Sequence, residues 1–114
     1  MRMWMVDPKL MCNKHLCGEH LECHMLAGTI LKRKNLKGYV NNNLVEVTKL
    51  KERHDILSEE MKKRGLNHKS SLLNYDLSYL SQEIINFKVN VVESYQELLR
   101  RCPKCRERQL KHKV

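Results

Sequence analysis

The chain lacks any long apolar run. No stretch approaches the roughly 20 consecutive apolar residues of a membrane span, and charged residues occur throughout the first twenty positions. Neither a transmembrane helix nor a secretory signal is expected, and we expect a cytoplasmic protein. No proline-rich or glycine-rich segment and no internal repeat divides the 114 residues, so we expect one small domain with a modest core.

Acidic residues are few beside the basic ones. Lys and Arg number 22 against 13 Asp and Glu, which gives a formal net charge of +9. A positive balance of this size favours a polyanionic partner, nucleic acid first, although many basic domains are merely soluble.

The chain also lacks an even number of cysteines. Five cysteines cannot all pair, and a reducing compartment keeps thiols free. Two of them, Cys102 and Cys105, have the spacing of half a zinc knuckle, so a structural zinc site is one interpretation. The remaining two ligands would have to come from elsewhere, and the candidates are Cys12 with Cys23, or His20 with His24. The other interpretation is that the cysteines are ordinary thiols that fill apolar stripes.

Apolar periodicity predicts an all-α, three-helix fold with irregular loops, forming a single domain over residues 1–105. The first helix should begin at Asp7-Pro8, where an N-cap precedes a proline at the first helical position, and should end near Leu26 because Gly28 follows. Its expected buried side consists of Leu10, Cys17, Leu21 and Met25. The basic, polar segment that continues to Asn43 is typical of a loop.

Two further helices are predicted. The second has an apolar stripe at alternating three- and four-residue spacing, ended by Gly65, and its members are Val47, Leu50, His54, Leu57 and Met61. Residues 68–89 are expected to be a loop with one short helical turn. Asn90 and Glu93 resemble a capping box for a third helix, which Pro103 stops and whose stripe is Val92, Tyr95, Leu99 and Cys102. Residues 106–114 are expected to be a basic, mobile tail.

Three ionisable residues share one stripe of the first predicted helix. At about 100° per residue, His15, Glu19 and Glu22 fall within an arc of roughly 60°. The stripe lies a short segment away from the terminal residue Met1. A terminal α-amine is partly neutral near pH 7 without the burial that a lysine requires, so it can act as a nucleophile, and a nearby carboxylate can stabilise a cation or accept a proton. Taken by themselves, these residues could also form a solvated polar face.

Two separated segments carry a family resemblance. Residues 50–69 resemble the second-helix signature of the phage-type pyrimidine-dimer DNA glycosylases, the endonuclease V family of ultraviolet repair. The matching residues at the two ends of this segment are Leu50-Lys51-Glu52-Arg53 and Lys63-Arg64-Gly65-Leu66-Asn67-His68-Lys69. The order His15, Glu19, Glu22 is similar to that on the family's first helix, and Arg2 matches the arginine after the nucleophilic terminal residue. The resemblance covers roughly the first seventy residues.

The resemblance implies a DNA base-excision repair enzyme, a glycosylase with abasic-site lyase activity. It would act on damaged double-stranded DNA, at a pyrimidine dimer or an abasic site, as a monomer that requires no cofactor. The amine of Met1 would form an imine with the deoxyribose, and Glu22 would be the acid and base. The implied DNA-binding residues are Arg2, His15, Arg64, Asn67 and Lys69. We expect Met1 to be retained, because a large second residue such as Arg2 hinders removal of the initiator methionine.

The sequence departs from the family pattern at two places. Leu21 and Met25 stand where the family has two further arginines, and the family's aromatic, lesion-contacting tail is missing. The alternative function is therefore a noncatalytic basic nucleic-acid-binding module, with or without stabilising zinc. A structural, partner-binding helical protein is a third class, and it would need an exposed apolar stripe.

Overall fold

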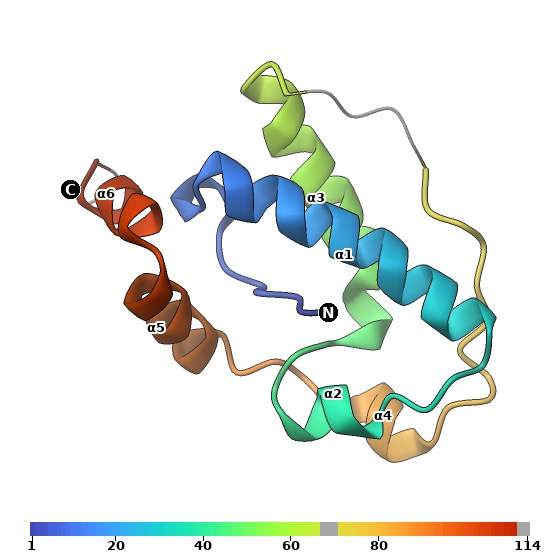
Figure 1. Ribbon diagram of the computed structural model, residues 1–114. Coiled ribbons are helices and arrows are strands. Elements are labelled where there is room, and N and C mark those ends of the chain that lie inside the picture. The colour runs from blue at the N-terminus through green and yellow to red at the C-terminus, as the bar shows by residue number, and fades with distance from the viewer. Residues whose placement is uncertain (67–70, 112–114) are drawn as a thin grey trace.

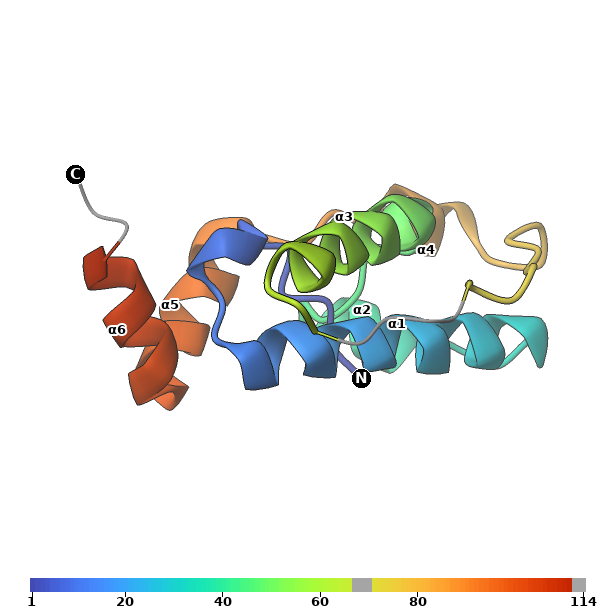
Figure 2. The same cartoon turned by 90° about the horizontal axis from the view of Figure 1, so that it is seen from above.

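The computed structural model describes residues 1–66 and 71–111, and all secondary structure within these residues is helical (Figure 1). The all-α prediction is confirmed. The 3₁₀ turns are η1 (Pro8–Leu10) and η2 (Val47–Lys49), and the α-helices are α1 (Asn13–Leu31), α2 (Lys37–Asn41), α3 (Leu50–Lys63), α4 (Gln82–Asn86), α5 (Val91–Arg101) and α6 (Pro103–Lys111). Helices α1 and α3 pack side by side, while α5 and α6 lie together at one end of the molecule (Figures 1 and 2).

The α3 stripe forms as predicted. Leu50, His54, Leu57 and Met61 are all buried, because their three- and four-residue spacing keeps them on the side that faces α1. Val47 is buried as well, in η2 just before the helix. Gly65 has φ +72°, the left-handed conformation that ends a helix and that glycine adopts without strain.

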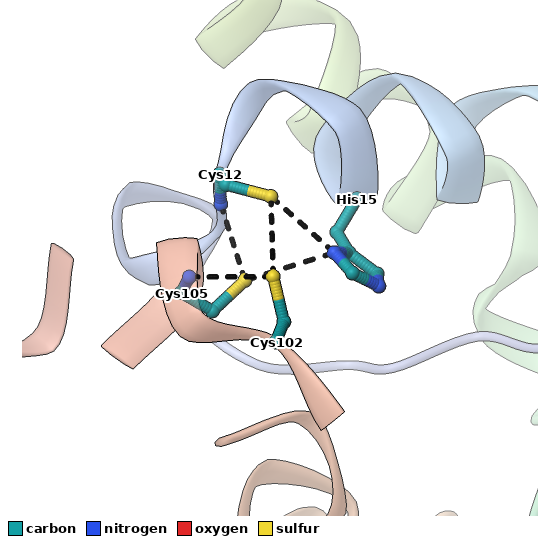
Figure 3. Close-up of side chains that lie close together, drawn as sticks. All are labelled: Cys12, His15, Cys102 and Cys105. Carbon is teal, nitrogen blue, oxygen red and sulfur yellow. Dashed lines mark hydrogen bonds between the residues drawn. The ribbon is translucent and has the colours of Figure 1, made fainter. Parts of the chain in front are cut away.

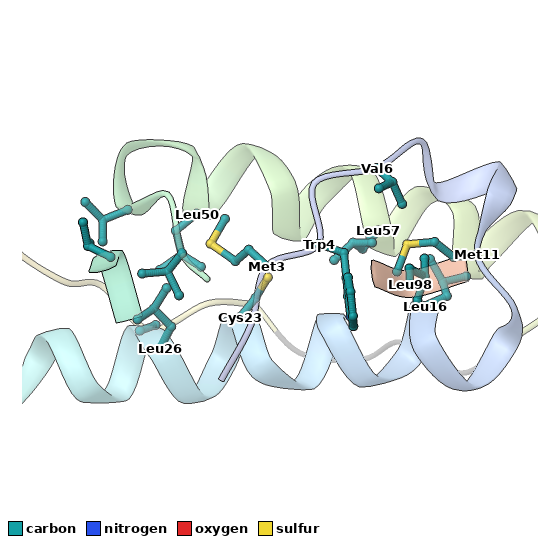
Figure 4. Close-up of a cluster of buried hydrophobic side chains, with 14 of the residues drawn as sticks. Met3, Trp4, Val6, Met11, Leu16, Cys23, Leu26, Leu50, Leu57 and Leu98 are labelled. Atoms are coloured by element: carbon teal, nitrogen blue, oxygen red, sulfur yellow. The ribbon is translucent and has the colours of Figure 1, made fainter. Parts of the chain in front are cut away.

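The first six residues form a non-helical segment that is part of the core. Met3, Trp4 and Val6 are buried, and Figure 4 shows Met3 and Trp4 between α1 and α3. The amide of Met3 donates to the carbonyl of Leu44 at 2.7 Å, and the Ser94 hydroxyl donates to the carbonyl of Trp4 at 2.6 Å. Side-chain burial and two hydrogen bonds from distant segments thus fix the chain terminus against α1.

The first predicted helix differs from the structure in its bounds. Asp7 does cap a helical turn, accepting from the Lys9 amide at 3.0 Å, but that turn is only η1. Extended backbone at Met11 and Cys12 separates it from α1. Helix α1 then continues through Gly28 to Leu31, because burying Ala27 and Ile30 outweighs the roughly 1 kcal/mol penalty of an internal glycine.

The predicted buried side of this helix is wrong. Leu21 and Met25 are 59% and 50% exposed, and Leu10 and Cys17 are only half-buried. The side chains that α1 buries are Leu16, Glu19, His20, Cys23, Leu26, Ala27 and Ile30. Two of them are polar, and they are accommodated because α3 supplies polar partners for them, which the spacing of apolar residues alone does not reveal.

The connecting segments and α5 confirm some of the predictions and correct others. The loop up to Asn43 contains the short helix α2, and the segment before Asn90 contains one helical turn, α4, as expected. Asn90 caps α5 by accepting from the Glu93 amide at 3.1 Å, as the capping pattern predicts. Within α5, however, Ser94 and Leu98 are buried while Val92 is 68% exposed.

The C-terminal segment is not a tail over its described length. Pro103 starts α6 rather than only stopping α5, since proline suits the first helical position, and α6 reaches Lys111. The Arg108 guanidinium donates to the Lys9 carbonyl at 2.9 and 3.0 Å and so attaches α6 to η1. Residues 112–114 of the predicted tail lie outside the described residues.

Candidate active site and thiol cluster

Glu22 lies on α1 beside the start of the chain. Its half-buried carboxylate accepts from the backbone N–H of Arg2 and feels the positive charge of the Met1 α-amine. The Met1 side chain reaches Thr29, seven residues after Glu22 on α1, whose hydroxyl is 3.8 Å from the Met1 Sδ atom. The structure therefore brings together the two residues that the sequence predicts to be catalytic.

Several charges act on the Glu22 carboxyl group. Burial raises the pKa of Glu22 above its usual value, and the like charge of Glu19 raises it further. The α-amine of Met1 and both the amide and the side chain of Arg2 act in the opposite direction. A carboxyl with a raised pKa beside an amine is suited to exchanging a proton during a reaction.

Arg2 is held by aromatic stacking. Its guanidinium lies over the Trp4 ring, 3.9 Å from the ring centroid, and Arg101 lies 6.0 Å from the same centroid. Burial and the neighbouring Arg101 lower the pKa of Arg2. This places a half-buried cation directly after the terminal amine, where the sequence predicts a phosphate contact.

Glu19 is drawn into the interior by a partner that sequence reasoning missed. Arg53 of α3 donates to both carboxylate oxygens of Glu19, at 2.6 and 3.0 Å, and both side chains are buried. Arg53 lies three residues after Leu50 and four before Leu57, so its place on the buried stripe could have been found from spacing. The pair links α1 to α3 three residues before Glu22 on α1.

His20 and His24 do not join Cys102 and Cys105, in contrast to one predicted zinc set. They lie with His54 of α3, with ring centroids 4.7 to 4.9 Å apart. The Nε2 atoms of His24 and His54 are 3.2 Å apart. The three rings form a histidine cluster that joins α1 to α3 and is separate from the cysteines.

A thiol cluster is formed by Cys12, His15, Cys102 and Cys105 (Figure 3). The Cys12 Sγ is 3.3 Å from the His15 Nδ1 and 3.8 Å from the Cys102 Sγ, and the Cys105 Sγ is 3.8 Å from the same Nδ1. Cys12, Cys102 and Cys105, three of the four members of one predicted set, are thus brought together. His15, predicted to contact DNA, is instead the fourth member of the cluster.

Cys23 is the predicted ligand that the structure removes from this set. It is fully buried in the core, where burial and then the charge of Glu19 raise the pKa of its thiol to about 12. Such a thiol is an apolar packing group rather than a ligand or nucleophile. Figure 4 shows it next to Met3, well inside the α1–α3 interface.

Arg64, predicted to bind DNA, has contacts within the fold. Its guanidinium donates to the carbonyls of Met11 and Pro8 at 2.8 and 2.9 Å and to the side chain of Asn13 at 3.0 Å. These contacts hold the end of α3 against the turn that precedes α1. The other two residues of that prediction, Asn67 and Lys69, lie outside the described residues.

A basic groove of about 700 Å³ lies beside the thiol cluster, between the start of α1 and α6. Its charged lining is mainly cationic and contains one carboxylate, that of Glu107. The cationic residues are Lys14, Arg101, Lys104, Arg108 and Lys111. A groove of this charge can accept a phosphate backbone.

The comparisons with known proteins identify a family for this chain. Within the described residues, no helix is both long enough and apolar enough to span a membrane. The comparisons with curated proteins and with solved structures find no match. A family model described as pyrimidine dimer DNA glycosylase matches residues 1–74, which include Met1, Glu22 and Arg53 and exclude α4, α5 and α6. The match extends over more than half of the 114 residues, and the chain therefore belongs to the pyrimidine dimer DNA glycosylase family.

Proposed function

We propose that this DNA-repair glycosylase also acts as an abasic-site lyase, with the Met1 α-amine as nucleophile and Glu22 as acid and base. The observation that carries the proposal is the half-buried Glu22 carboxylate beside the terminal amine. The two groups come from segments that the fold fixes independently, since the N-terminal segment is hydrogen-bonded to Leu44 and Ser94. Such fixed positioning is what an attack on a sugar carbon requires.

In the proposed first step, the neutral amine attacks the anomeric carbon of the damaged nucleotide. A carbon–nitrogen bond forms to Met1, and the bond from that carbon to the base breaks, so the base leaves with the bonding electrons and takes up a proton. The negative charge of Glu22 stabilises the positive charge that develops on the sugar. Loss of the amine proton and opening of the sugar ring then give an imine.

In the second step, Glu22 removes a proton from the carbon next to the imine. The electrons of that bond expel the 3′ phosphate, and the strand is cut by elimination. Water then releases Met1 from the product. One carboxylate therefore serves both steps, and the Glu22 carboxylate, which accepts from the Arg2 amide and feels the charge of the Met1 amine, is placed for both.

For the DNA contacts we propose Arg2 at the phosphate next to the lesion and the basic groove at a more distant phosphate. The lesion class is the pyrimidine dimer of the family, with an abasic site as a second substrate. His15 and Arg64 are left out, because the thiol cluster and the end of α3 engage their polar atoms.

The direct test is covalent trapping. In borohydride, the protein should become attached to a duplex that contains one abasic site, and peptide mass mapping should place the adduct on the N-terminal peptide. The matched control carries an uncleaved extension before Met1, which removes the amine from the site without changing any internal residue. It should keep its helical circular dichroism and form no adduct.

Other outcomes would overturn the mechanism. An adduct on a lysine would assign the nucleophile to a side chain. Duplex binding without any adduct or cleavage would support the alternative, a noncatalytic basic nucleic-acid-binding module. Exposed Leu21 and Met25 favour that alternative most, since they stand where the resemblance predicts arginines.

A further inference from the structure

We propose that the thiol cluster of Cys12, His15, Cys102 and Cys105 is a structural zinc site that fastens α5 and α6 to the catalytic part of the molecule. Two of the ligands lie inside residues 1–74 and two lie beyond them. The site therefore joins the family-matched region to a part of the chain that the match does not cover. The proposal does not depend on the glycosylase or lyase chemistry.

The spacing of the four ligand atoms suits a tetrahedral ion. With Zn–S near 2.3 Å and Zn–N near 2.0 Å, tetrahedral geometry separates two sulfurs by about 3.8 Å and a sulfur from a nitrogen by about 3.5 Å. The observed separations are 3.8 Å between the sulfurs of Cys12 and Cys102, and 3.3 and 3.8 Å from the His15 Nδ1 to Cys12 and Cys105. All four ligand atoms lie within 4.8 Å of one another. Figure 3 shows the side chains converging on a common centre from α1 and from the α5–α6 junction.

Backbone amides already support the sulfurs as thiolates. The Cys105 amide donates to the Cys102 Sγ at 3.4 Å, across the knuckle, and the Cys12 amide donates to the Cys105 Sγ at 3.3 Å. Such hydrogen bonds orient thiolate ligands and disperse their charge. The cysteines are also buried, so the ion would be shielded from water.

Charge balance favours the ion as well. Binding releases three thiol protons to solvent, and the neutral imidazole binds through Nδ1 while its other nitrogen keeps the proton. Three thiolates and Zn²⁺ leave a net charge of −1. Lys14, Arg101 and Lys104 in the adjoining groove are placed to offset that charge.

The cluster occupies the place where α5 and α6 most need attachment. Helix α5 packs chiefly against α6, and α6 against η1, so neither has an extensive interface with α1 or α3. Beyond the cluster, the hydrogen bonds that join α5 and α6 to the rest of the chain include Ser94 to Trp4 and Arg108 to Lys9. His15 also packs edge-on against Trp4, with ring centroids 5.9 Å apart. A metal here would therefore stabilise the segment that carries the terminal amine.

The experiment combines metal content with a cobalt spectrum. The purified full-length protein should contain about one zinc per chain by elemental analysis. Replacing zinc with Co²⁺ should give strong thiolate-to-metal charge-transfer absorption together with the visible bands of a tetrahedral site. Cys102→Ser should lose most of the metal and the charge-transfer absorption. Cys17→Ser is the matched control, since Cys17 is a half-buried thiol outside both ligand clusters.

The single tryptophan supplies a second measurement on the unaltered protein. Because Trp4 contacts His15, chelation of zinc should shift its fluorescence, and added zinc should restore it. X-ray absorption of the zinc protein should give three sulfur ligands and one nitrogen ligand at the distances above, even if the Cys102→Ser variant fails to fold.

Three results would overturn the proposal. Cobalt absorption without thiolate charge transfer, abolished by His54→Ala, would place the metal in the histidine cluster instead. The purified protein could instead contain no metal, and its Trp4 fluorescence could stay unchanged on addition of chelator or zinc. The four residues would then be three packed thiols and an imidazole. A disulfide between Cys12 and Cys102, found by mass mapping, would mean that their sulfurs close from 3.8 Å to a covalent bond.

Discussion

At the scale of single residues, Glu22 decides between an enzyme and a binding module. Glu22→Gln keeps the size of the side chain but removes its negative charge and its capacity to take a proton. Strand cleavage at a lesion should fall by roughly two to four orders of magnitude in single-turnover assays. Affinity for the same duplex should stay the same or rise slightly, because a carboxylate repels phosphate.

A matched control for this variant is Glu59→Gln, on the exposed side of α3. It should leave cleavage unchanged. Unchanged cleavage in Glu22→Gln itself would show that Glu22 is a structural or solvated carboxylate with no part in cleavage. Some trapped complex on preformed abasic DNA should survive in Glu22→Gln, since the imine forms from the amine.

The raised pKa of Glu22 gives a pH prediction. The carboxylate must be ionised to act, so the acid limb of the cleavage rate should lie above the pH at which an exposed glutamate titrates. The folded state binds this proton more tightly than the unfolded state, so ionised Glu22 lowers stability as pH rises through that window. Glu22→Gln should therefore be at least as stable as the wild type at pH 7, and the difference should vanish towards pH 4. Denaturant unfolding at both pH values measures it, and a loss of stability at pH 7 would contradict it.

At the scale of helices, the Glu19–Arg53 pair holds α1 to α3. Arg53→Met should destabilise the protein by about 3 to 5 kcal/mol, because it leaves the buried Glu19 carboxylate without its partner. The double variant Glu19→Leu with Arg53→Met removes both charges and should recover most of that loss. Chemical denaturation of the two variants checks the prediction.

An exposed ion pair on α5 is the control for this experiment. Glu97 is paired with Arg100 and Arg101 on the surface, and Glu97→Gln should change stability far less than Arg53→Met. If the two single variants were equally damaging, the burial of the Glu19–Arg53 pair would not be what makes it important.

The exposed apolar residues of α1 give a second prediction at this scale. Leu21 and Met25 lie near Glu22 on the helix surface, and their exposed fractions are 59% and 50%. Leu21→Arg and Met25→Arg should each strengthen duplex binding at low salt, adding about 0.9 to the slope of log affinity against log salt if each gains one phosphate. Leu110→Arg, exposed at the far end of α6, serves as the control for added charge alone. Equal effects of all three would mean that α1 is not placed against DNA.

At the scale of the whole molecule, the net charge of +9 should dominate weak binding to intact DNA. Log affinity for a duplex without a lesion should fall linearly with log salt, by about 0.9 for each phosphate neutralised. Candidate phosphate partners include Arg2 and the cations of the basic groove. Fluorescence anisotropy over a range of salt concentrations measures the slope. Binding that ignores salt would indicate a protein partner instead.

The sequence predicts those parts of the fold that depend on local rules. The α3 stripe, the stop at Gly65 and the Asn90 cap are all found in the structure, because spacing, backbone conformation and capping act within a few residues. The buried side of α1 could not be predicted in this way. Glu19 is interior only because Arg53, 34 positions later in the chain, reaches it.

The candidate site shows the same division. Glu22 and Met1 follow from a helix near a chain terminus and from the family resemblance, and the structure places them together. The knuckle of Cys102 and Cys105 is a local pattern, whereas the choice of Cys12 over Cys23 depends on how α5 and α6 fold back onto α1. His15 follows Cys12 by three positions, which is a local spacing, but its other partners in the cluster lie up to 90 positions away.

The hydrogen bond from Ser94 to Trp4 has a consequence for synthesis on the ribosome. Trp4 is made early, but the hydroxyl that holds its carbonyl is 90 positions further along the chain. At 5 to 20 residues per second, translation takes about 5 to 20 s to span that interval. During this time the terminal amine is accessible to enzymes that deformylate, trim or acetylate nascent chains. Modification of this amine, the proposed nucleophile, can therefore precede the hydrogen bond that Ser94 donates to Trp4.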